Sequence, residues 1–423
     1  MSAGPDTVEV ALEPPPAWAL SVAEGLRGAG FEAYFVGGAV RDRLLGRPVS
    51  DWDIATDAEP EAVMGCFARA IPTGLQHGTV TVVVAHQPVE VTTYRVERGY
   101  SDGRRPDEVA FTRELRDDLG RRDFTINAMA WDAVAGVLVD PYDGRGDLGR
   151  RLLRAVGAAE ERFSEDGLRA LRAVRFACVL ELALDPATRA AIPATMATFR
   201  KVSAERIRVE LGKILAARRV AWGVEALGET GLLGEFLPEA LPGFARAVAA
   251  LGEPPAGEVA RLAVLLHGGG SDGDGPLRRL RYGNEERGRL VALLRQRGLD
   301  PAVARSDAAV RALVAQVGLS VVDEVIAYRM ALARVDAPDE YAAWAALAAR
   351  IDAIGARSAP QSARELSLDG KAVMAALGIA PSRRVGRILD ALLMRVWADP
   401  SLDTPERLRA LLPVVAAEVG EGA

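Results

Sequence analysis

The chain has 423 residues, of which 49% are hydrophobic and 26% charged, with a formal net charge of −6. This length predicts two to four folding units, and the composition is that of a globular protein. We expect neither a membrane span nor a signal peptide, since Met1 to Val10 lacks a basic region followed by an apolar run. Cys66 and Cys178 are expected to be free, buried thiols of a cytoplasmic protein.

A glycine pair is the first feature along the chain that predicts chemistry. Gly37 and Gly38 separate a predicted strand over 34–36 from a predicted helix over 39–45, which carries Arg41 in its first turn. Backbone N–H groups at such a turn bind phosphate oxygens, and Arg41 adds positive charge. The segment therefore predicts a phosphate-binding turn.

Two alternate carboxylates follow. On a strand, Asp51 and Asp53 share one face, while Trp52 and Ile54 turn toward the core. Close carboxylates repel each other unless a cation lies between them, and Mg²⁺ prefers hard oxygen ligands. We therefore predict that Asp51 and Asp53 are catalytic residues and ligands of Mg²⁺, beside a bound nucleoside triphosphate.

Together, Gly-Gly-x-x-Arg-Asp and Asp-x-Asp resemble the opening motif of the class II tRNA nucleotidyltransferase and poly(A) polymerase family. Further motifs of that family follow to about residue 215. The resemblance implies an α+β fold, with a small polymerase-β-like nucleotidyltransferase head of mixed sheet and helices before an all-helical neck, body and tail. The expected parts are a leader (1–17), head (18–148), neck (149–220), body (221–330) and tail (331–423).

Strand patterns over 80–85 and 89–94 predict a hairpin with its turn at 86–88. Glu90 and Tyr94 would then share one strand face. The resemblance implies that Glu90 completes a catalytic carboxylate triad, and an exposed strand residue is the alternative.

The segment 121–128 closely matches the family's second motif. Arg121 and Arg122 suit triphosphate oxygens, since arginine makes charge-assisted contacts. Asp123 is expected to cap the next helix or bind a ribose hydroxyl, and Asn127 to bind sugar or phosphate. The segment 140–147 resembles the third motif, and its Pro and Gly content predicts a turn.

The segment 162–176 carries the most mechanistic prediction. On a helix, Asp166 and Arg169 lie one turn apart, Arg172 and Arg175 continue that side, and Phe176 packs away from it. A carboxylate acceptor beside a guanidinium donor matches the amino group and ring nitrogen of cytosine or adenine, and rejects uracil and guanine. A surface ion pair is the alternative.

The segment 202–211 resembles the fifth motif. Ser203 is expected to cap a helix, and Arg206 to pair with Glu210 as structural support. Between 150 and 219 there are 15 Lys or Arg residues against 8 Asp or Glu, which indicates a surface that contacts phosphates.

We expect CCA addition to the 3′ end and acceptor region of tRNA from CTP and ATP. The segment 74–82 looks like the CCA-adding branch, and 95–120 keeps a long loop that includes 101–106. Poly(A) polymerase, partial A-adding or CC-adding activity, and an inactive RNA-binding protein remain alternatives. A His-Asp metal phosphohydrolase site needs several imidazole ligands. Because the chain has only three histidines, we do not expect such a site. The oligomeric state stays open.

Overall fold

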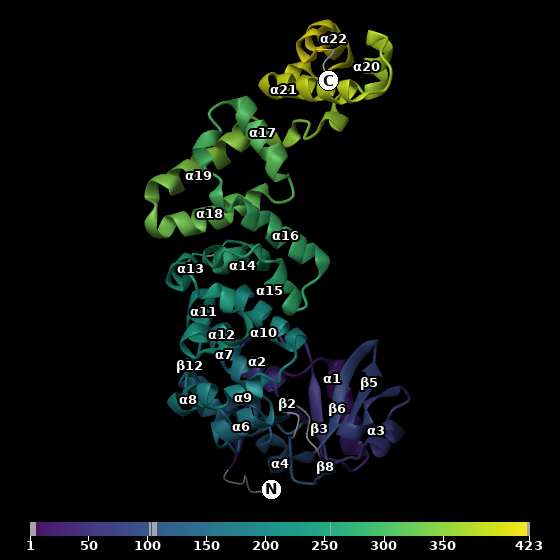
Figure 1. Cartoon of the computed structure of the whole chain (residues 1–423). Helices are drawn as coiled ribbons and strands as arrows, with labels where there is room; N and C mark the ends of the chain where they lie inside the picture. The colour runs from purple at the N-terminus through teal and green to yellow at the C-terminus, as the bar shows by residue number, and fades with distance from the viewer. Residues whose placement is uncertain (1–5, 101–102, 104–107, 254, 421–423) are drawn as a thin grey trace. The chain divides into compact units, whose positions relative to one another are not determined.

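The computed structural model describes residues 6–100, 103, 108–253 and 255–420 (Figure 1). The chain divides into two compact units, with the boundary between Phe236 and Leu237. None of the described helices is long and apolar enough to cross a membrane. The predicted boundary at 330/331 falls inside the continuous helix α18 (Val322–Asp336), so the finer domain limits stay predictions. Apart from Gly103, the loop residues 101–106 lie outside the described residues.

The first unit combines strands with helices. Its strands are β1 (Thr7–Glu9), β2 (Tyr34–Val36), β3 (Asp53–Thr56), β4 (Ala70–Gly74), β5 (Thr79–Val84), β6 (Gln87–Thr93), β7 (Arg95–Arg98), β8 (Glu108–Phe111), β9 (Ala130–Asp132), β10 (Val137–Val139), β11 (Leu152–Leu153) and β12 (Ala183–Leu184). Its helices are α1 (Ala17–Gly28), α2 (Gly38–Leu44), α3 (Pro60–Cys66), α4 (Leu115–Gly120), α5 (Gly144–Gly149), α6 (Ala159–Glu165), α7 (Leu168–Leu180), α8 (Pro186–Ala194), α9 (Met196–Phe199), α10 (Ala204–Ala216), α11 (Val220–Glu229) and α12 (Leu232–Phe236), with 3-10 turns η1 (Leu75–His77) and η2 (Thr125–Asn127).

An eight-stranded mixed sheet organises this unit, in the order β1-β10-β9-β2-β3-β6-β5-β4 (Figure 1). β3 and β6 are its parallel pair, and the other neighbours are antiparallel. α1 and α3 pack against β5 and β6. The predicted α+β head is therefore confirmed. Within the expected leader, Thr7–Glu9 form β1, which pairs with β10 at the sheet edge.

The glycine turn has the predicted strand–turn–helix form. β2 ends at Val36, Gly37 has a φ of 70°, and α2 begins at Gly38. A positive φ is accessible to glycine at no steric cost. A Cβ at Gly37 would also lie 3.0 Å from Nη1 of Arg122. This position therefore needs glycine both for its backbone and for the approach of an arginine.

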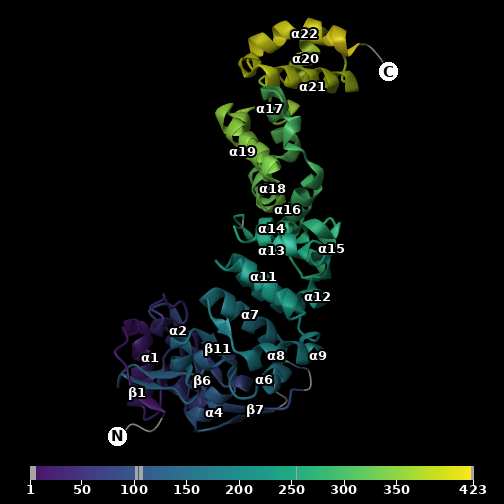
Figure 2. The same cartoon turned by 90° about the vertical axis from the view of Figure 1, so that its left-hand side faces the viewer.

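Helices continue the unit after the sheet. α7 packs against α6, α8, α10 and α11, and Figure 2 shows it next to α8 and α11. Ten of its thirteen residues are buried, so it forms the centre of this helical layer. The first half of the 140–147 segment forms the predicted turn, and its second half begins α5. Asp140 accepts backbone N–H bonds from Gly144 and Arg145 at 2.7 and 2.8 Å.

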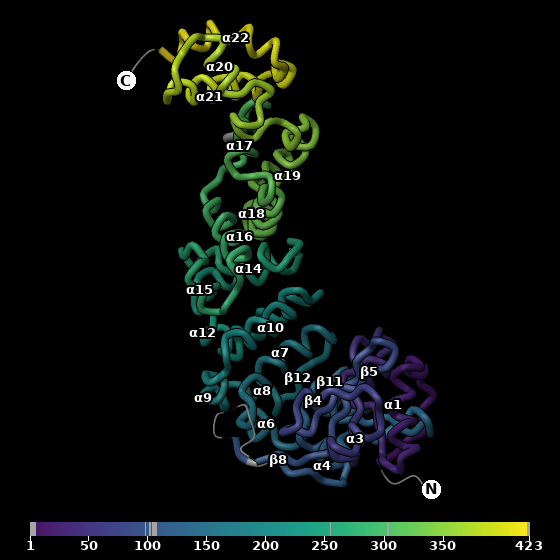
Figure 3. The backbone as a smooth tube through the Cα atoms, turned by 90° about the vertical axis from the view of Figure 1, so that its right-hand side faces the viewer, coloured from purple at the N-terminus to yellow at the C-terminus, as the bar shows by residue number. Residues whose placement is uncertain are grey.

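The second unit is helical throughout its described residues, as predicted. Its helices are α13 (Phe244–Ala250), α14 (Glu258–Leu266), α15 (Asp274–Arg279), α16 (Asn284–Arg295), α17 (Asp307–Val317), α18 (Val322–Asp336), α19 (Pro338–Ala353), α20 (Gly370–Leu377), α21 (Arg383–Ala398) and α22 (Pro405–Val419). Its 3-10 turns are η3 (Pro238–Ala240), η4 (His267–Gly269), η5 (Gln296–Gly298), η6 (Pro301–Val303), η7 (Ala356–Ser358), η8 (Ala363–Glu365) and η9 (Pro400–Leu402). The last three helices share a core around Ile388, Leu408 and Val415 (Figure 3).

Three single residues complete the comparison with the sequence. Cys178 is a buried free thiol, as expected, whereas Cys66 is free but only half-buried. His267 packs against Tyr328 in the second unit. Burial, followed by the nearby Arg329, lowers the pKa of His267 to about 4, so it is a neutral, structural histidine at pH 7.

The β5–β6 hairpin is confirmed, but its turn lies at Ala85 and His86 rather than at 86–88. Both residues have positive φ angles, 49° and 63°. A two-residue turn with positive φ at both positions matches the twist of the flanking strands. Asn-Gly is the sequence most favoured at these two positions, because Asn and Gly tolerate positive φ.

We predict that Ala85→Asn combined with His86→Gly raises the free energy of unfolding by about 1 kcal/mol, because it relieves left-handed strain. Urea unfolding measures the change. Replacing both residues by valine is the control and should lower stability. A double variant no more stable than the native protein would contradict this interpretation of the turn.

Candidate functional site

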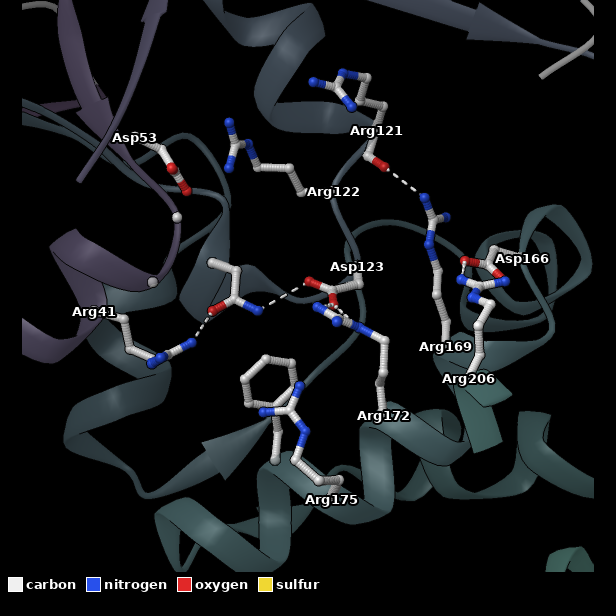
Figure 4. A pocket seen from close by; sticks show the side chains of 14 residues that line it. Arg41, Asp53, Arg121, Arg122, Asp123, Asp166, Arg169, Arg172, Arg175 and Arg206 are labelled. Atoms are coloured by element: carbon white, nitrogen blue, oxygen red, sulfur yellow. Dashed lines mark hydrogen bonds and ion pairs between the residues drawn. The ribbon is translucent and has the colours of Figure 1, made fainter. Parts of the chain in front are cut away.

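A cavity of about 490 Å³ lies inside the first unit, between the glycine turn and α7 (Figure 4). Seven arginines and three aspartates line it, an excess of four positive charges. Such an excess suits a ligand with several negative charges. The lining residues are Gly37, Gly38, Arg41, Asp53, Arg121, Arg122, Asp123, Asn127, Asp166, Arg169, Arg172, Arg175, Phe176 and Arg206.

Tertiary structure brings twelve of the fourteen predicted site residues to this cavity. Asp51 and Glu90 are the two that do not line it, whereas Phe176 and Arg206 line it without having been predicted as site residues. The segments around Gly37, Arg121 and Asp166 lie far apart in the sequence, so their meeting supports the interpretation of each.

The carboxylates lie at the parallel pair of the sheet. Asp53 opens β3, and its Cα stands opposite that of Glu90 on β6. Asp51 precedes the strand, is exposed, and accepts a hydrogen bond from Ser50 Oγ at 2.8 Å. Burial and the neighbouring charge of Glu90 raise the pKa of Asp53 to about 6, against the opposing charge of Arg122.

Two details of this region differ from the prediction. Trp52 and Ile54 are buried as expected, but the strand begins at Asp53, so Asp51 is not part of its face. Tyr94 does not share the face of Glu90, because β6 ends at Thr93 and the buried Tyr94 donates to Glu32. Among the described residues, no three His, Cys, Asp or Glu side chains form a group that could hold a metal by themselves.

A chain of hydrogen bonds crosses the floor of the cavity (Figure 4). Arg41 Nη1 donates to Asn127 Oδ1 at 2.6 Å, and Asn127 Nδ2 donates to Asp123 at 2.9 Å. Arg172 donates to the other Asp123 oxygen through Nε at 2.9 Å and Nη2 at 2.6 Å. Asp123 does not cap the following helix, since its nearest backbone donor is Phe124. It holds Arg172 and Asn127 in place.

Arg121 and Arg122 both contact a buried carboxylate that the sequence analysis missed. Asp118 accepts from Arg121 Nη2 at 2.8 Å and from Arg122 Nη2 at 3.2 Å. Glu97 also accepts from Arg121, at 3.1 Å. The spacing of three and four residues between Asp118 and the arginines was a readable signal for this pairing.

Phe176 is the aromatic centre of the arginine cluster. The guanidinium carbons of Arg41, Arg172 and Arg175 lie 5.2, 5.1 and 3.3 Å from its ring centroid. An aromatic face attracts cations and also separates them, since it carries negative potential without a charge. The prediction that Phe176 packs away from the arginines was therefore wrong: Phe176 adjoins Arg175, and both turn into the cavity.

Asp166 lies outside a helix, at the end of α6, with φ and ψ of −136° and 107°. Its carboxylate pairs with Arg206 from α10, not with Arg169. Arg169 instead bonds Glu165 and the backbone oxygen of Arg121. Asp166 is thus an extended residue that ends α6, and it does not share a helix with Arg169, because α7 begins only at Leu168.

The fifth-motif pairing also differs from the expected one. Glu210 accepts from Arg175 Nε at 2.7 Å, so the predicted Arg206–Glu210 pair is wrong. Ser203 precedes α10, but its side chain makes no capping hydrogen bond. Helix α10 thus supplies counter-charges to two cavity residues, Asp166 and Arg175.

Comparison with known proteins agrees with this geometry. A model of the poly A polymerase head domain matches residues 33–154, and one described as a probable RNA and SrmB-binding site of polymerase A matches 181–243. A solved Bacillus stearothermophilus CCA-adding enzyme in complex with CTP is 34% identical. That likeness covers 96% of this chain and 99% of the other, with a TM-score of 0.75. The chain belongs to the CCA-adding enzyme family.

Curated CCA-adding enzymes match over a shorter range. That of Lactobacillus delbrueckii is 51% identical over 51% of this chain, and that of Geobacillus stearothermophilus is 48% identical over 54%. These matches cover 54% and 56% of the relatives. The chain therefore spans about half the length of the curated relatives it matches.

In this member of the CCA-adding enzyme family, Asp123 generates a testable pH dependence. Burial by itself would raise its pKa, but Arg172 and Asn127 overcome that effect and hold it at about 2, below the ordinary 3.8. An acid with a depressed folded pKa stabilises the fold above its unfolded pKa and loses that contribution as the pH falls through the folded value.

We predict that Asp123→Asn costs about 2 kcal/mol at pH 6, and that the difference from the native protein shrinks between pH 4 and pH 2. Denaturant unfolding of both proteins across this range gives the measurement. The exposed variant Asp117→Asn is the control and should show no comparable trend. A constant difference would mean that the charge of Asp123 is not what stabilises the cavity floor.

Proposed function

We propose that this chain adds C, C and A to the 3′ end of tRNA, using CTP and ATP and releasing pyrophosphate. The observation that carries the proposal is the cavity itself, in which seven arginines share the lining with Asp53, whose strand neighbour is Glu90. Its support is the 34% identity, across nearly the whole chain, with a CCA-adding enzyme solved with CTP. A cytoplasmic site of action fits the two free thiols.

The carboxylates fit a divalent cation. Asp53 and Glu90 are opposite each other on adjacent strands, and their repulsion contributes to the raised pKa of Asp53. Mg²⁺ is usually held by one or two carboxylates together with substrate phosphates, so a cage made only of protein side chains is not required. We propose that Asp51 and Asp53 hold Mg²⁺, which when bound supplies a Lewis acid to the reacting oxygens.

The arginines of the cavity position the triphosphate. Arg41, Arg121 and Arg122 line the cavity together with the glycine turn, and the first backbone N–H groups of α2 have no partner within the helix. The terminal hydroxyl of the RNA attacks the α-phosphorus, and the bond to the oxygen that bridges to the β-phosphorus breaks. The hydroxyl proton passes to Glu90, and pyrophosphate leaves with the bonding electrons. Fixed guanidinium groups stabilise the charge that develops.

Base selection rests on Asp166 and Arg169. Both line the cavity, although they do not bond each other. One carboxylate acceptor and one guanidinium donor match the edge of cytosine or adenine, with no nucleic-acid template.

The RNA partner fits the basic segment 150–219. Exposed arginines there include Arg151, Arg200 and Arg218, whose side chains lie at the surface beside Glu181 or Glu235. Binding to tRNA through phosphate contacts of this kind should weaken with salt.

Incubating the purified protein with tRNA that lacks its 3′ end tests the proposal. We expect CTP alone to give two added residues, ATP alone to give none, and both together to give three. The head-domain match carries the name of poly A polymerase, so repeated addition from ATP alone would favour that alternative. Addition that stops after CC, or that requires a CC end, would indicate a partial activity, and no addition would contradict the proposal.

We predict that Asp53→Asn lowers nucleotide addition at least about a hundredfold, because a lost metal ligand acts mainly on the charged transition state. Its thermal midpoint should hold or rise, since the raised pKa of Asp53 shows that its charge opposes folding at pH 7. Asp117→Asn, an exposed carboxylate outside the cavity, should keep full activity. Near-normal turnover of Asp53→Asn with Mg²⁺ would remove this residue from the metal site.

A further inference from the structure

The ion pair between Asp166 and Arg206 is the feature of the cavity that the function above does not explain. Arg206 Nη1 donates to Asp166 Oδ1 at 3.0 Å, and Nη2 donates to Oδ2 at 2.6 Å. Figure 4 shows the two side chains facing each other at the edge of the cavity that they both line. A two-bond fork of this kind fixes the plane of a carboxylate as well as neutralising it.

The hydrogen bonds of Asp166 leave it with little freedom. Oδ1 also accepts the backbone N–H of Leu168 at 3.0 Å, so this oxygen has two donors. A carboxylate oxygen accepts about two hydrogen bonds. Oδ2 therefore retains one acceptor position without a partner among the described residues, and Asp166 can take one N–H of a base amino group in one defined direction.

Arg169 is held independently of Asp166. It donates to Arg162 O at 3.1 Å, to Arg121 O at 2.9 Å and to the carboxylate of Glu165. Five N–H groups are available to an arginine, so donors remain for a ring nitrogen. The acceptor and the donor that read a base are thus fixed by separate partners.

We propose that Arg206 is a positioning residue that determines which nucleobases the site accepts, because it fixes the Asp166 carboxylate apart from the other arginines. This inference rests on the proposed nucleotide addition. Without Arg206, the carboxylate is left beside Arg169 and Arg172, whose positive charges attract it. A pair between Asp166 and either arginine would occupy the acceptor or the donor that the base needs.

A purely structural role makes a different prediction. If the ion pair only ties α10 to the end of α6, its loss lowers stability and affects all four nucleotides alike. If Arg206 positions the acceptor, its loss reduces the preference for CTP over UTP. Glu210 provides a matched control, since it lies one turn further along α10 and pairs with Arg175 rather than with Asp166.

The experiment measures kcat/KM for the addition of CMP and UMP to tRNA lacking its 3′ end, together with the thermal midpoint. The variants are Arg206→Gln, Arg206→Lys and Glu210→Gln. We expect Arg206→Gln to reduce the CTP-to-UTP ratio about tenfold or more, since a charge-assisted pair is lost. Arg206→Lys keeps the positive charge but cannot form the two-bond fork. Its CTP-to-UTP ratio should therefore lie between those of Arg206→Gln and the native protein. Glu210→Gln should lower both rates and leave the ratio unchanged.

A double variant tests whether Arg206 acts through Asp166. Asp166→Asn alone should reduce the ratio, and adding Arg206→Gln to it should cause no further loss, because coupled residues are not additive. An unchanged ratio in Arg206→Gln, or a full additive loss in the double variant, would overturn the inference while the native protein still adds nucleotides. Failure of the native protein to add any nucleotide would instead contradict the proposed function.

Discussion

Seven guanidinium groups around one small cavity are the constraint on which the rest of the first unit depends. Like charges at this density repel strongly when water is partly excluded. Each arginine therefore needs a partner that neutralises it without blocking the cavity. Asp118 holds Arg121 and Arg122, Asp123 holds Arg172, and Glu210 holds Arg175. These carboxylates contact the arginines and leave positive charge free for a ligand.

Phe176 is a second means of reducing the repulsion among the cavity arginines. Three guanidinium groups lie near its ring, where an aromatic face offers attraction without a counter-ion. A carboxylate at this position would neutralise one arginine and reduce the excess charge of the cavity. The aromatic ring orders the cluster and preserves that excess.

The sheet and the helical layer contribute different parts to this arrangement. β2 and β3 place the glycine turn and Asp53, whose backbone positions are held by strand register. α7 and α10 supply four of the cavity arginines and the counter-charge of Glu210, and the packing of these two helices sets their distances. Under the proposed function, phosphate chemistry therefore depends on backbone geometry in the sheet, whereas the choice of base depends on side-chain pairing in the helical layer.

Local pattern was enough for the sequence by itself to determine the strand–turn–helix at Gly37, the hairpin that carries Glu90, and six of the seven arginines that line the cavity. These features follow from turn chemistry and from strand and helix periodicity, which neighbouring residues encode. Only the tertiary structure decided the partners. Asp166 and Arg206 are 40 residues apart in the sequence, and Arg175 and Glu210 are 35 residues apart. In both cases the local pair expected from helix spacing was wrong. A charged side chain pairs with the opposite charge that folding brings nearest, and helix periodicity cannot specify which helix packs beside it.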